Sequence, residues 1–473
     1  MTIKTKFINR EDELAYIEQE YKDTNFKFIS IIGRRRVGKT RLIEEFIKEK
    51  KSASYFLVQE LDDLGLRMSF AEKLHRDLNM NFLGTPTWDD IFKEIFMLSE
   101  TSRIILIFDE FQRFLKINKS VPSLLQGYID KYAKKSKLFL IVTGSSIGMM
   151  HRLFDYSSAL YGRRTGQITI SPLKSFYLNE WFPGTPLEKI IEIYSVFGGT
   201  PKYLEDAEPE KTLVENIKNK ILDKRSILYI EPEILIKTEL AESSTYMSIL
   251  KLISEGKTKS IEIADSLSIK TTSLNYFLNI LEKDMEFIKK ELIVTEQKER
   301  QKKVIYKMND PFFKFWFRYI YPYKSDIEIE NTDYVIQKIE NNINSFTGYC
   351  FEDVCKEILL KSNTKDEPTP FKFSKIGSWW GHKRENGLRK ELEIDIVALN
   401  ENTKEILFCE CKWQKNVDAK RILYDLKEKS KFVEWNKENR AEYYAVFAKS
   451  FQNKISEPDT ILFDLTDLEN AIK

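Results

Sequence analysis

The first 172 residues alternate short apolar runs with amphipathic segments. Between the apolar runs lie stretches with helical spacing, such as 88–99, where apolar residues recur every three or four positions. Strands and helices that alternate in this way pack as a mostly parallel sheet covered by helices on both faces. We therefore expect a three-layer α/β sandwich, with strands at 26–32, 55–59, 104–108, 138–143 and 167–170.

The pattern divides the rest of the chain into four segments. Residues 173–240 show helical periodicity only, which predicts a small helical lid subdomain. Residues 241–310 predict three short helices and two strands, the order of a winged helix-turn-helix. An aromatic-rich stretch, 311–344, is expected to be a helical connector, and 345–473 to be a second α/β domain. A core of residues 1–172 is thus followed by four smaller parts.

The predicted winged helix-turn-helix has features that favour DNA contact and one that does not. Its third helix buries Leu274 and Leu278 in one stripe and turns mainly polar side chains outwards. Four cations lie at or beside the tip of the strand pair, where they could contact phosphates: Lys298, Arg300, Lys302 and Lys303. The third helix itself carries few cations, so a role as a lid or as a protein contact is the alternative.

Composition and charge limit the classes of protein to which the chain can belong. Of the 473 residues, 42% are hydrophobic and 31% are charged, as in ordinary soluble globular proteins. The net charge is only +2, so any contact with nucleic acid has to come from local patches. No apolar stretch reaches the roughly 18 residues needed to cross a membrane, and the N-terminal residues lack an apolar signal core. We expect a cytoplasmic protein with no membrane partner.

The most specific motif lies between the first predicted strand and the following helix. Residues 33–40 read Gly-Arg-Arg-Arg-Val-Gly-Lys-Thr, the G-x-x-x-x-G-K-S/T phosphate-binding loop in the strand–turn–helix context that it requires. Backbone N–H groups and the helix N-terminus would surround the phosphates. Lys39 would reach the β- and γ-phosphates, and Thr40 would place its hydroxyl on Mg²⁺. We expect ATP to bind through Gly33, Arg34, Arg35, Arg36, Val37, Gly38, Lys39, Thr40 and Arg41.

A second motif follows the third predicted strand, which ends in Asp109 and Glu110. Asp109 would lie beside the phosphate-binding loop and hold Mg²⁺ through water, and Glu110 would polarise the water that attacks the γ-phosphate. Thr143 ends the next strand, where its hydroxyl could sense the γ-phosphate or merely cap a helix. Arg163 and Arg164 could neutralise transition-state charge, from the same chain or from a neighbour, or could be an ordinary solvated pair.

These motifs together resemble those of the archaeal-type ATPases of the AAA+/STAND superfamily. The resemblance spans roughly residues 7–240 and rests on Phe7-Ile-Asn-Arg10-Glu11, the phosphate-binding loop, Phe108-Asp109-Glu110, Thr143-Gly-Ser, Tyr161-Gly-Arg-Arg and Gly198-Gly-Thr-Pro201. It implies that Arg10 and Glu11 lie near the adenine pocket, and that Gly199 and Pro201 contact the nucleotide from the lid. It also implies that assembly into a homo-oligomer, or a regulatory protein partner, can control hydrolysis.

The C-terminal segment contains a second candidate site. Residues 391–398 and 406–413 predict two strands. If they pair as a hairpin, Asp395 and Glu410 can converge on one divalent cation, with Mg²⁺ as the expected metal. Lys412 shares a face with Glu410 and could orient the attacking water. The alternation also predicts that Ile394, Ile396, Cys409 and Cys411 point away from these carboxylates.

This arrangement resembles the PD-(D/E)XK, or restriction-endonuclease-like, nuclease fold, whose minimal signature is Asp…Glu-x-Lys on two paired strands. Glu352 matches the acidic residue that this fold places on its first helix, and Ile394 replaces the proline of the name. The resemblance implies Mg²⁺-dependent DNA cleavage with Glu352, Asp395, Glu410 and Lys412 as catalytic residues. The alternatives are a half-exposed strand face with ordinary charges, or a fold that binds without cutting.

Four cysteines in the same segment raise a competing metal hypothesis. Cys350, Cys355, Cys409 and Cys411 have the spacings C-x4-C and C-x-C, which differ from the paired C-x2-C of common zinc sites. On a core-facing strand position, free cysteine packs like a small hydrophobe. We therefore favour a structural role for these thiols over a zinc site.

The combined prediction is an ATP-binding and ATP-hydrolysing protein that binds DNA and couples its nucleotide state to a Mg²⁺-dependent nuclease-like domain. The family resemblance alone suggests a setting in defence or mobile-element processing. The alternative is a nucleotide-gated switch or scaffold whose C-terminal domain binds nucleic acid or protein without cleaving it. The residues do not distinguish RNA from DNA.

Overall fold

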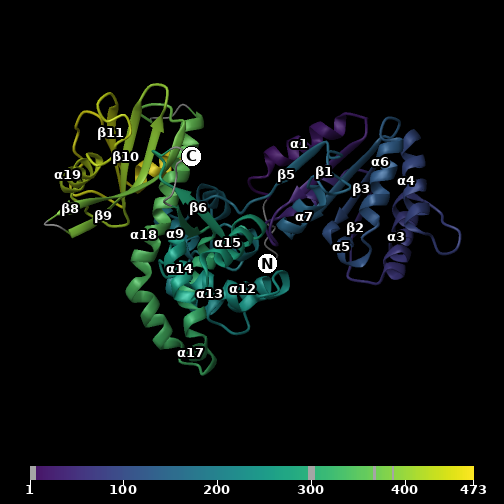
Figure 1. Cartoon of the computed structure of the whole chain (residues 1–473), viewed down its shortest axis with the longest axis horizontal. Coiled ribbons are helices and arrows are strands. Elements are labelled where there is room, and N and C mark those ends of the chain that lie inside the picture. Colours follow the sequence, from purple (N-terminus) through teal and green to yellow (C-terminus); the bar gives the residue numbers. More distant parts are fainter. Residues whose placement is uncertain (1–6, 297–303, 366–368, 386–387, 473) are drawn as a thin grey trace. The chain divides into compact units, whose positions relative to one another are not determined.

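The computed structural model describes residues 7–296, 304–365, 369–385 and 388–472. The chain forms two compact units (Figure 1). The first unit comprises the chain up to Pro172 together with Thr200–Lys202 and Lys283–Met285, and the second unit comprises the remainder. The four cations predicted at the hairpin tip lie outside the described residues: Lys298, Arg300, Lys302 and Lys303.

A five-stranded parallel sheet forms the centre of the first unit, in the strand order β2-β3-β4-β1-β5. The strands are β1 (Lys27–Ile32), β2 (Ala53–Leu57), β3 (Ile104–Asp109), β4 (Leu138–Gly144) and β5 (Gly166–Thr169). The helices are α1 (Glu11–Lys22), α2 (Lys39–Ile47), α3 (Asp63–Leu78), α4 (Trp88–Thr101), α5 (Phe114–Ile117), α6 (Val121–Tyr132) and α7 (Ile147–Phe154). The prediction of an α/β sandwich with a parallel sheet is confirmed.

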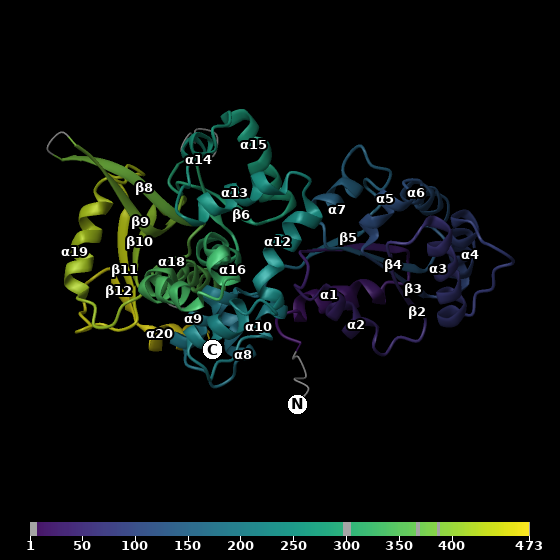
Figure 2. The same ribbon diagram turned by 90° about the horizontal axis from the view of Figure 1, so that it is seen from below.

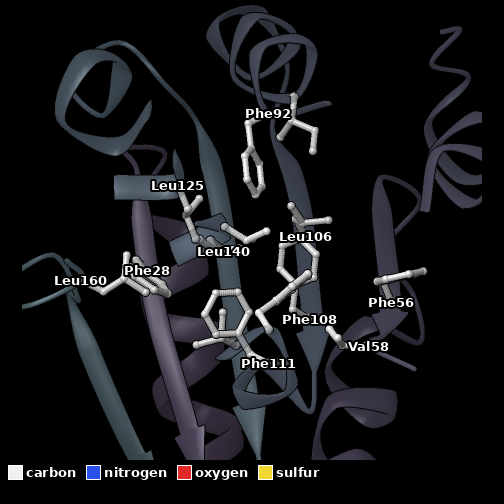
Figure 3. Packing of buried hydrophobic residues seen from close by; sticks show 14 of the residues in the cluster. Phe28, Phe56, Val58, Phe92, Leu106, Phe108, Phe111, Leu125, Leu140 and Leu160 are labelled. Atoms are coloured by element: carbon white, nitrogen blue, oxygen red, sulfur yellow. The ribbon is translucent and has the colours of Figure 1, made fainter. Parts of the chain in front are cut away.

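The two faces of this sheet are buried in separate hydrophobic cores. One core, which Figure 3 shows from close by, contains Phe28, Leu106 and Leu140 of the strands with Phe92 of α4 and Leu125 of α6. The other core is formed on the opposite face by Ile29, Ile31, Ile107 and Ile141 of the strands with Leu42 and Phe46 of α2. Strands that are buried on both faces read as continuous apolar runs, which is why this sheet was predictable.

The second unit begins with helices and a short antiparallel strand pair. The elements are α8 (Leu178–Trp181), α9 (Leu187–Phe197), α10 (Pro201–Leu204), α11 (Leu213–Asn216), α12 (Ile227–Glu239), α13 (Ser243–Ser254), α14 (Ser260–Leu267), α15 (Thr271–Asn279), β6 (Ile288–Leu292), β7 (Val304–Met308), α16 (Pro311–Tyr319) and α17 (Lys324–Glu328). Among the helices that the structure describes, none is both long enough and apolar enough to cross a membrane.

The long helix α18 (Thr332–Lys365) connects this helical part to the C-terminal sheet. It runs for 34 residues without a break and passes through position 344, where the predicted connector meets the predicted C-terminal domain. Thr347 of α18 has its Oγ1 3.2 Å from Oγ of Ser195 in α9. Farther along, Ser175 donates to the Glu357 carboxylate from its backbone N–H at 2.9 Å and its hydroxyl at 2.6 Å.

The C-terminal sheet has the strand order β12-β11-β10-β9-β8. Its elements are β8 (Lys375–Glu385), β9 (Leu388–Asn400), β10 (Glu405–Lys412), α19 (Ala419–Ser430), β11 (Ala441–Ala448), β12 (Thr460–Phe463) and α20 (Leu465–Ile472). Strands β8, β9 and β10 are antiparallel neighbours, and α19 crosses over to β11, which lies parallel to β10. Helix α19 covers one face of the sheet and α18 lies against the other (Figure 2).

Strand β9 contains one extra residue beside β8. Gly377 pairs with Val397, whereas Trp379 pairs with Ile394, so two steps along β8 match three steps along β9. The extra residue lies within 395–396. Such a β-bulge changes the direction in which the neighbouring side chains point, and bulges are frequent beside functional sites.

Candidate functional sites

The phosphate-binding loop runs from the end of β1 to the first residue of α2, Lys39. Gly38 has a φ of 100°, in the left-handed region that glycine adopts most readily. Gly33 is constrained differently, because a Cβ atom there would lie 2.3 Å from the carbonyl oxygen of Ile170. Both glycines are therefore required by the backbone of the loop.

Lys39 places its ammonium group inside this loop. Its Nζ donates hydrogen bonds to the carbonyl oxygens of Gly33 and Arg34, at 2.7 and 2.8 Å. Only 6% of Lys39 is exposed. A buried cation, a left-handed glycine and a helix N-terminus form a set of donors that fits the phosphates of ATP.

The arginines around the loop occupy different places. Arg10, at the start of α1, donates to the carbonyl oxygens of Val37 at 3.3 Å and Ser171 at 2.6 Å, so it ties this helix to the loop. Arg41 lies on the exposed side of α2, 3.5 Å from the Glu44 carboxylate. Contact with the nucleotide stays a prediction for Arg10, Arg34, Arg35, Arg36 and Arg41.

The Asp109 carboxylate accepts hydrogen bonds from three hydroxyl groups at the carboxyl ends of the strands. Thr40 donates to its Oδ2 at 3.5 Å, Tyr55 donates to the same oxygen, and Thr143 donates to Oδ1. The structure thus brings Thr40, Asp109 and Thr143 together, as the motifs predicted, and their oxygens suit Mg²⁺. Burial, with the hydrogen bond to Asp109 in second place, raises the pKa of Tyr55 above its usual range. The sequence analysis missed Tyr55 because strand order is not visible in the sequence.

Glu110 is held at the start of the turn that follows β3. Its backbone is left-handed, with a φ of 57°. Its Oε2 accepts hydrogen bonds from Nε2 of Gln112 at 2.5 Å and from Oγ of Ser145 at 2.8 Å. These two partners were also missed, although Ser145 lies two residues after Thr143 in a run of hydroxyl residues.

Arg163 and Arg164 lie at the opposite end of the sheet from the phosphate-binding loop. They directly precede β5, which runs parallel to β1, so they sit where these strands begin. Arg163 pairs with Asp130 at 3.1 Å, and the Arg164 guanidinium lies 4.0 Å from the centre of the Phe154 ring. Parallel strands separate their two ends, so these arginines lie away from the phosphate-binding loop of their own chain. Their action on a nucleotide, from the same chain or from a neighbour, stays a prediction.

The glycine turn before α10 has a structural explanation of its own. The backbone N–H of Leu173 donates to the carbonyl oxygen of Gly199 at 2.7 Å. A Cβ atom on Gly199 would lie 1.8 Å from the carbonyl oxygen of Leu173. This close approach requires glycine without reference to a ligand. The contact of Gly199 and Pro201 with the nucleotide therefore stays a prediction.

The second candidate site combines residues from α18, β9 and β10. Strands β9 and β10 pair as an antiparallel hairpin, with Cys409 opposite Ile396, so the predicted hairpin is confirmed. Asp395 accepts a hydrogen bond from the backbone N–H of Cys411 at 2.8 Å, and Lys412 lies 2.7 Å from the Glu410 carboxylate. Burial and the charge of Glu410 raise the pKa of Asp395 to about 7.

Glu352 joins this group from α18. Burial, followed by the charge of Asp395, raises the pKa of Glu352 well above its usual range. The charge of Asp395 thus acts on Glu352, and the charge of Glu410 acts on Asp395, which is the electrostatic situation that a divalent cation relieves. Among the described residues, however, no three His, Cys, Asp or Glu side chains are already arranged to hold a metal ion.

The bulge in β9 changes the alternation of side chains that the sequence predicted along this strand. Ile394 packs in the cluster that contains Val397 of the same strand and Leu423 and Leu426 of α19. Positions 394 and 397 can share a face only because the extra residue interrupts the alternation of side chains.

Lys429 is a further member of this site that the sequence analysis missed. It lies on α19, and its Nζ is 3.0 and 2.8 Å from the two carboxylate oxygens of Glu410. The Glu410 carboxylate thus has two ammonium partners. No signal in the sequence pointed to Lys429, because its position depends on how α19 packs on the sheet.

The four cysteines are buried free thiols. Burial is the main cause that raises the pKa of each of them: Cys350, Cys355, Cys409 and Cys411. A zinc-bound cysteine is a thiolate, and burial of this kind opposes thiolate formation. The structural role that we favoured for these thiols is consistent with this environment.

Comparison with known proteins identifies two family matches in the chain. A family described as "ATPase domain predominantly from Archaea" matches residues 7–207. A family described as "Archaea bacterial proteins of unknown function" matches residues 316–422. Both matches lie in order along one polypeptide, so the archaeal-type ATPase domain is followed here by a second conserved module.

Similar whole proteins and solved structures are also known. The uncharacterized protein MJECL04 of Methanocaldococcus jannaschii is 38% identical over 465 residues, which cover 98% of this chain and 99% of that protein. The Walker-type ATPase PABY2304 of Pyrococcus abyssi is 22% identical, with a TM-score of 0.48 over 66% of this chain and 96% of its own. The ORC2 protein of Aeropyrum pernix, in ADPNP–ADP complexes, is 15% identical, with a TM-score of 0.45 over 70% of this chain and 95% of its own. On the strength of its near full-length match, the chain belongs to the same family as the Methanocaldococcus jannaschii protein and carries an archaeal-type ATPase domain.

Proposed function

We propose that this protein hydrolyses ATP in its first unit and binds and cleaves DNA with a Mg²⁺-dependent carboxylate site in its second unit, with the nucleotide state controlling cleavage. The observation that carries the ATPase part is the meeting of Lys39, Thr40 and Asp109 at one end of a parallel sheet. That edge is where nucleotides bind in open α/β folds. The match to an archaeal ATPase domain supports the same assignment.

Each residue of the first site would have a separate role in ATP hydrolysis. Mg²⁺ would supply positive charge that offsets the negative charge of the phosphates. Thr40 and Asp109 are the residues that would hold it. Lys39 would neutralise charge on the transferred phosphoryl group. Glu110 would accept the proton of the attacking water, and Gln112 and Ser145 keep its carboxylate in one orientation.

The second site supports phosphodiester hydrolysis through its charges. Asp395 and Glu410 would hold a divalent cation, whose positive charge would polarise a water molecule and a phosphate oxygen. Lys412 would orient that water. The raised pKa of Asp395 and that of Glu352 support this assignment, because carboxylates that repel one another gain most from a cation.

A DNA contact for the second unit is supported by α13, α14, α15 and the β6–β7 pair, which follow the order of a winged helix-turn-helix. In α15, Leu274 and Leu278 are buried, whereas Thr272, Asn275 and Tyr276 are exposed. An exposed polar helix face of this kind can enter the major groove. We therefore propose duplex DNA as the substrate, and RNA is the comparison to include in the test.

The test is a cleavage assay on linear and supercoiled DNA with Mg²⁺ or Mn²⁺, in the presence and absence of ATP. We expect the wild-type protein to cleave the DNA. The Asp395→Asn variant should cleave it at least about 100-fold more slowly, since the substitution weakens the metal site. Lys39→Ala should alter the ATP dependence of cleavage and leave the carboxylate site intact. Asp425→Asn, an exposed carboxylate on α19, is the matched control. Equal cleavage by the Asp395 and Asp425 variants would contradict the proposal.

One observation favours a second function, a nucleotide-gated switch whose C-terminal domain binds without cutting. Lys412 and Lys429 both neutralise Glu410, and the described residues hold no ready group of three metal ligands. A domain of this kind would bind phosphates by charge alone. DNA binding that ATP modulates, with no cleavage in either metal, would favour this second function.

A further inference from the structure

Four lysines gather beside the carboxylate site of the second unit. Lys289 lies on β6, Lys307 on β7, Lys314 on α16 and Lys356 on α18. They come from four different elements, so no single motif predicts them. They are also distinct from the cations expected at the hairpin tip.

Two carboxylates partly neutralise this group. Lys289 Nζ lies 2.7 Å from Asp353 and 3.6 Å from Glu291, and Lys307 Nζ lies 3.0 Å from Glu291. Partial burial raises the pKa of Asp353, but the charge of Lys289, reinforced by other lysines, outweighs this effect and holds the pKa at about 2. The lysines thus outnumber these carboxylates by two.

Lys314 and Lys356 account for the excess of positive charge. Within the described part of the chain, neither has a carboxylate at ion-pair distance; Lys314 Nζ instead lies 4.9 Å from the centre of the Tyr349 ring. Burial lowers the pKa of both ammonium groups. An ammonium group whose charged form is disfavoured by burial gains from a bound anion.

The lysine cluster reaches solvent. The Lys289 side chain is 31% exposed, its partner Asp353 is 49% exposed, and Lys307 is 29% exposed. Ion pairs that are this exposed contribute little to stability, so an anion can displace them at small cost. A ligand can therefore approach the ammonium groups.

The cluster also adjoins the candidate cleavage site. The charges of the lysines lower the pKa of Asp353, and the charge of Asp395 raises the pKa of the neighbouring residue, Glu352. The charges of Glu352 and Glu393 are among those that raise the pKa of Lys307. The β6–β7 pair is fixed to the C-terminal sheet, because Ile293 packs in the same hydrophobic cluster as Trp379 of β8. The lysines and the carboxylates therefore lie close enough for their charges to interact.

We propose that Lys289, Lys307, Lys314 and Lys356 bind the phosphate backbone of a nucleic-acid strand and hold the adjacent phosphodiester at Glu352, Asp395 and Glu410. This inference rests on the proposed function, and it gives the β6–β7 pair a direct part in substrate binding. Carboxylates alone repel a polyanion, and the lysine cluster offsets that repulsion at the point of approach. The predicted preference is for the backbone, without regard to base sequence.

The test is fluorescence anisotropy of labelled duplex and single-stranded DNA with the full-length protein in EDTA, where no cleavage occurs. The double variant Lys314→Gln/Lys356→Gln should bind at least about 10-fold more weakly, and the salt slope of log K should fall by about 2, for two lost phosphate contacts. Lys431→Gln/Lys437→Gln is the matched control, since these exposed lysines pair with nearby Glu428 and Glu434. An unchanged melting temperature confirms that the variants fold.

The outcomes separate this inference from the proposed cleavage. Lysine variants that lose binding support the lysine site even if the wild-type protein never cuts DNA. Lysine variants that keep full affinity and an unchanged salt slope overturn it, even if Asp395→Asn abolishes cleavage. Tighter binding of polyglutamate than of DNA would also overturn it, because the site would then be one for an acidic protein.

Discussion

The two candidate sites hold their carboxylates in opposite ways. Asp109 and Glu110 of the first unit receive hydrogen bonds from neutral groups, the hydroxyls and amide of Thr40, Ser145 and Gln112 among them. Asp395 and Glu410 of the second unit face each other and are balanced by ammonium groups. A carboxylate held by neutral donors is fixed in place without repulsion from a second charge. A carboxylate held against another one is kept at a cost that a cation or a proton can relieve.

The largest effect is expected from removing charge at the first site. Glu110→Gln keeps an oxygen that can accept from Ser145, so the fold and ATP affinity should change little. The water would lose its proton acceptor, and hydrolysis should fall by about 10² to 10⁴-fold. Phosphate release and calorimetric ATP titration measure the two quantities. Glu44→Gln on the exposed side of α2 is the control. Full activity in Glu110→Gln would remove Glu110 from the mechanism.

Removing charge at the second site should have a different result, a gain in stability. The pKa of Asp395 in the folded protein, about 7, lies above the ordinary value near 4. The folded state therefore binds an extra proton in this range, and stability is lost as the pH rises from about 4 to about 7. Asn cannot ionise, so Asp395→Asn should melt at least about 4 °C higher than wild type at pH 8. The difference in melting temperature between Asp395→Asn and the wild type should become smaller towards pH 5.

Scanning calorimetry in EDTA checks this prediction, with Asp425→Asn as the control for loss of an exposed carboxylate. A melting temperature of Asp395→Asn that shows the same offset at both pH values would mean that mutual repulsion is absent. The second site would then not differ from the first in having carboxylates that repel each other. Adding Mn²⁺ at pH 8 should stabilise the wild type and leave Asp395→Asn nearly unchanged.

The smallest effect is expected from one neutral donor at the first site. Tyr55→Phe removes a single hydroxyl from Asp109 and leaves the hydroxyls of Thr40 and Thr143. A hydrogen bond of this kind contributes about 1 kcal/mol, so ATP turnover should fall less than about 10-fold. Steady-state kinetics at saturating and limiting Mg²⁺ measure the change. A loss as large as that of Glu110→Gln would show that Tyr55 takes part in the chemistry.

The same contrast explains how much the sequence predicted. Lys39 and Thr40 lie in one loop, and Asp109 ends a buried strand, so local pattern and the rule that parallel strands end together placed them correctly. Tyr55 and Lys429 were missed because their roles depend on strand order and helix packing. The bulge in β9 was missed because one extra residue leaves no mark in an alternating pattern. The position of Arg163, away from the phosphate-binding loop, was not foreseen because a sequence does not show at which end of a sheet a loop lies.

The unbroken course of α18 has a mechanical consequence. At 1.5 Å per residue, its 34 residues form a rod about 51 Å long. Thr347 and Glu357 fasten that rod to Ser195 and Ser175, and Glu352 lies between these two anchor points. A rod displaces all of its attachments together. A shift of α9 by even a fraction of an ångström would therefore change the distance between the carboxylates of Glu352 and Asp395.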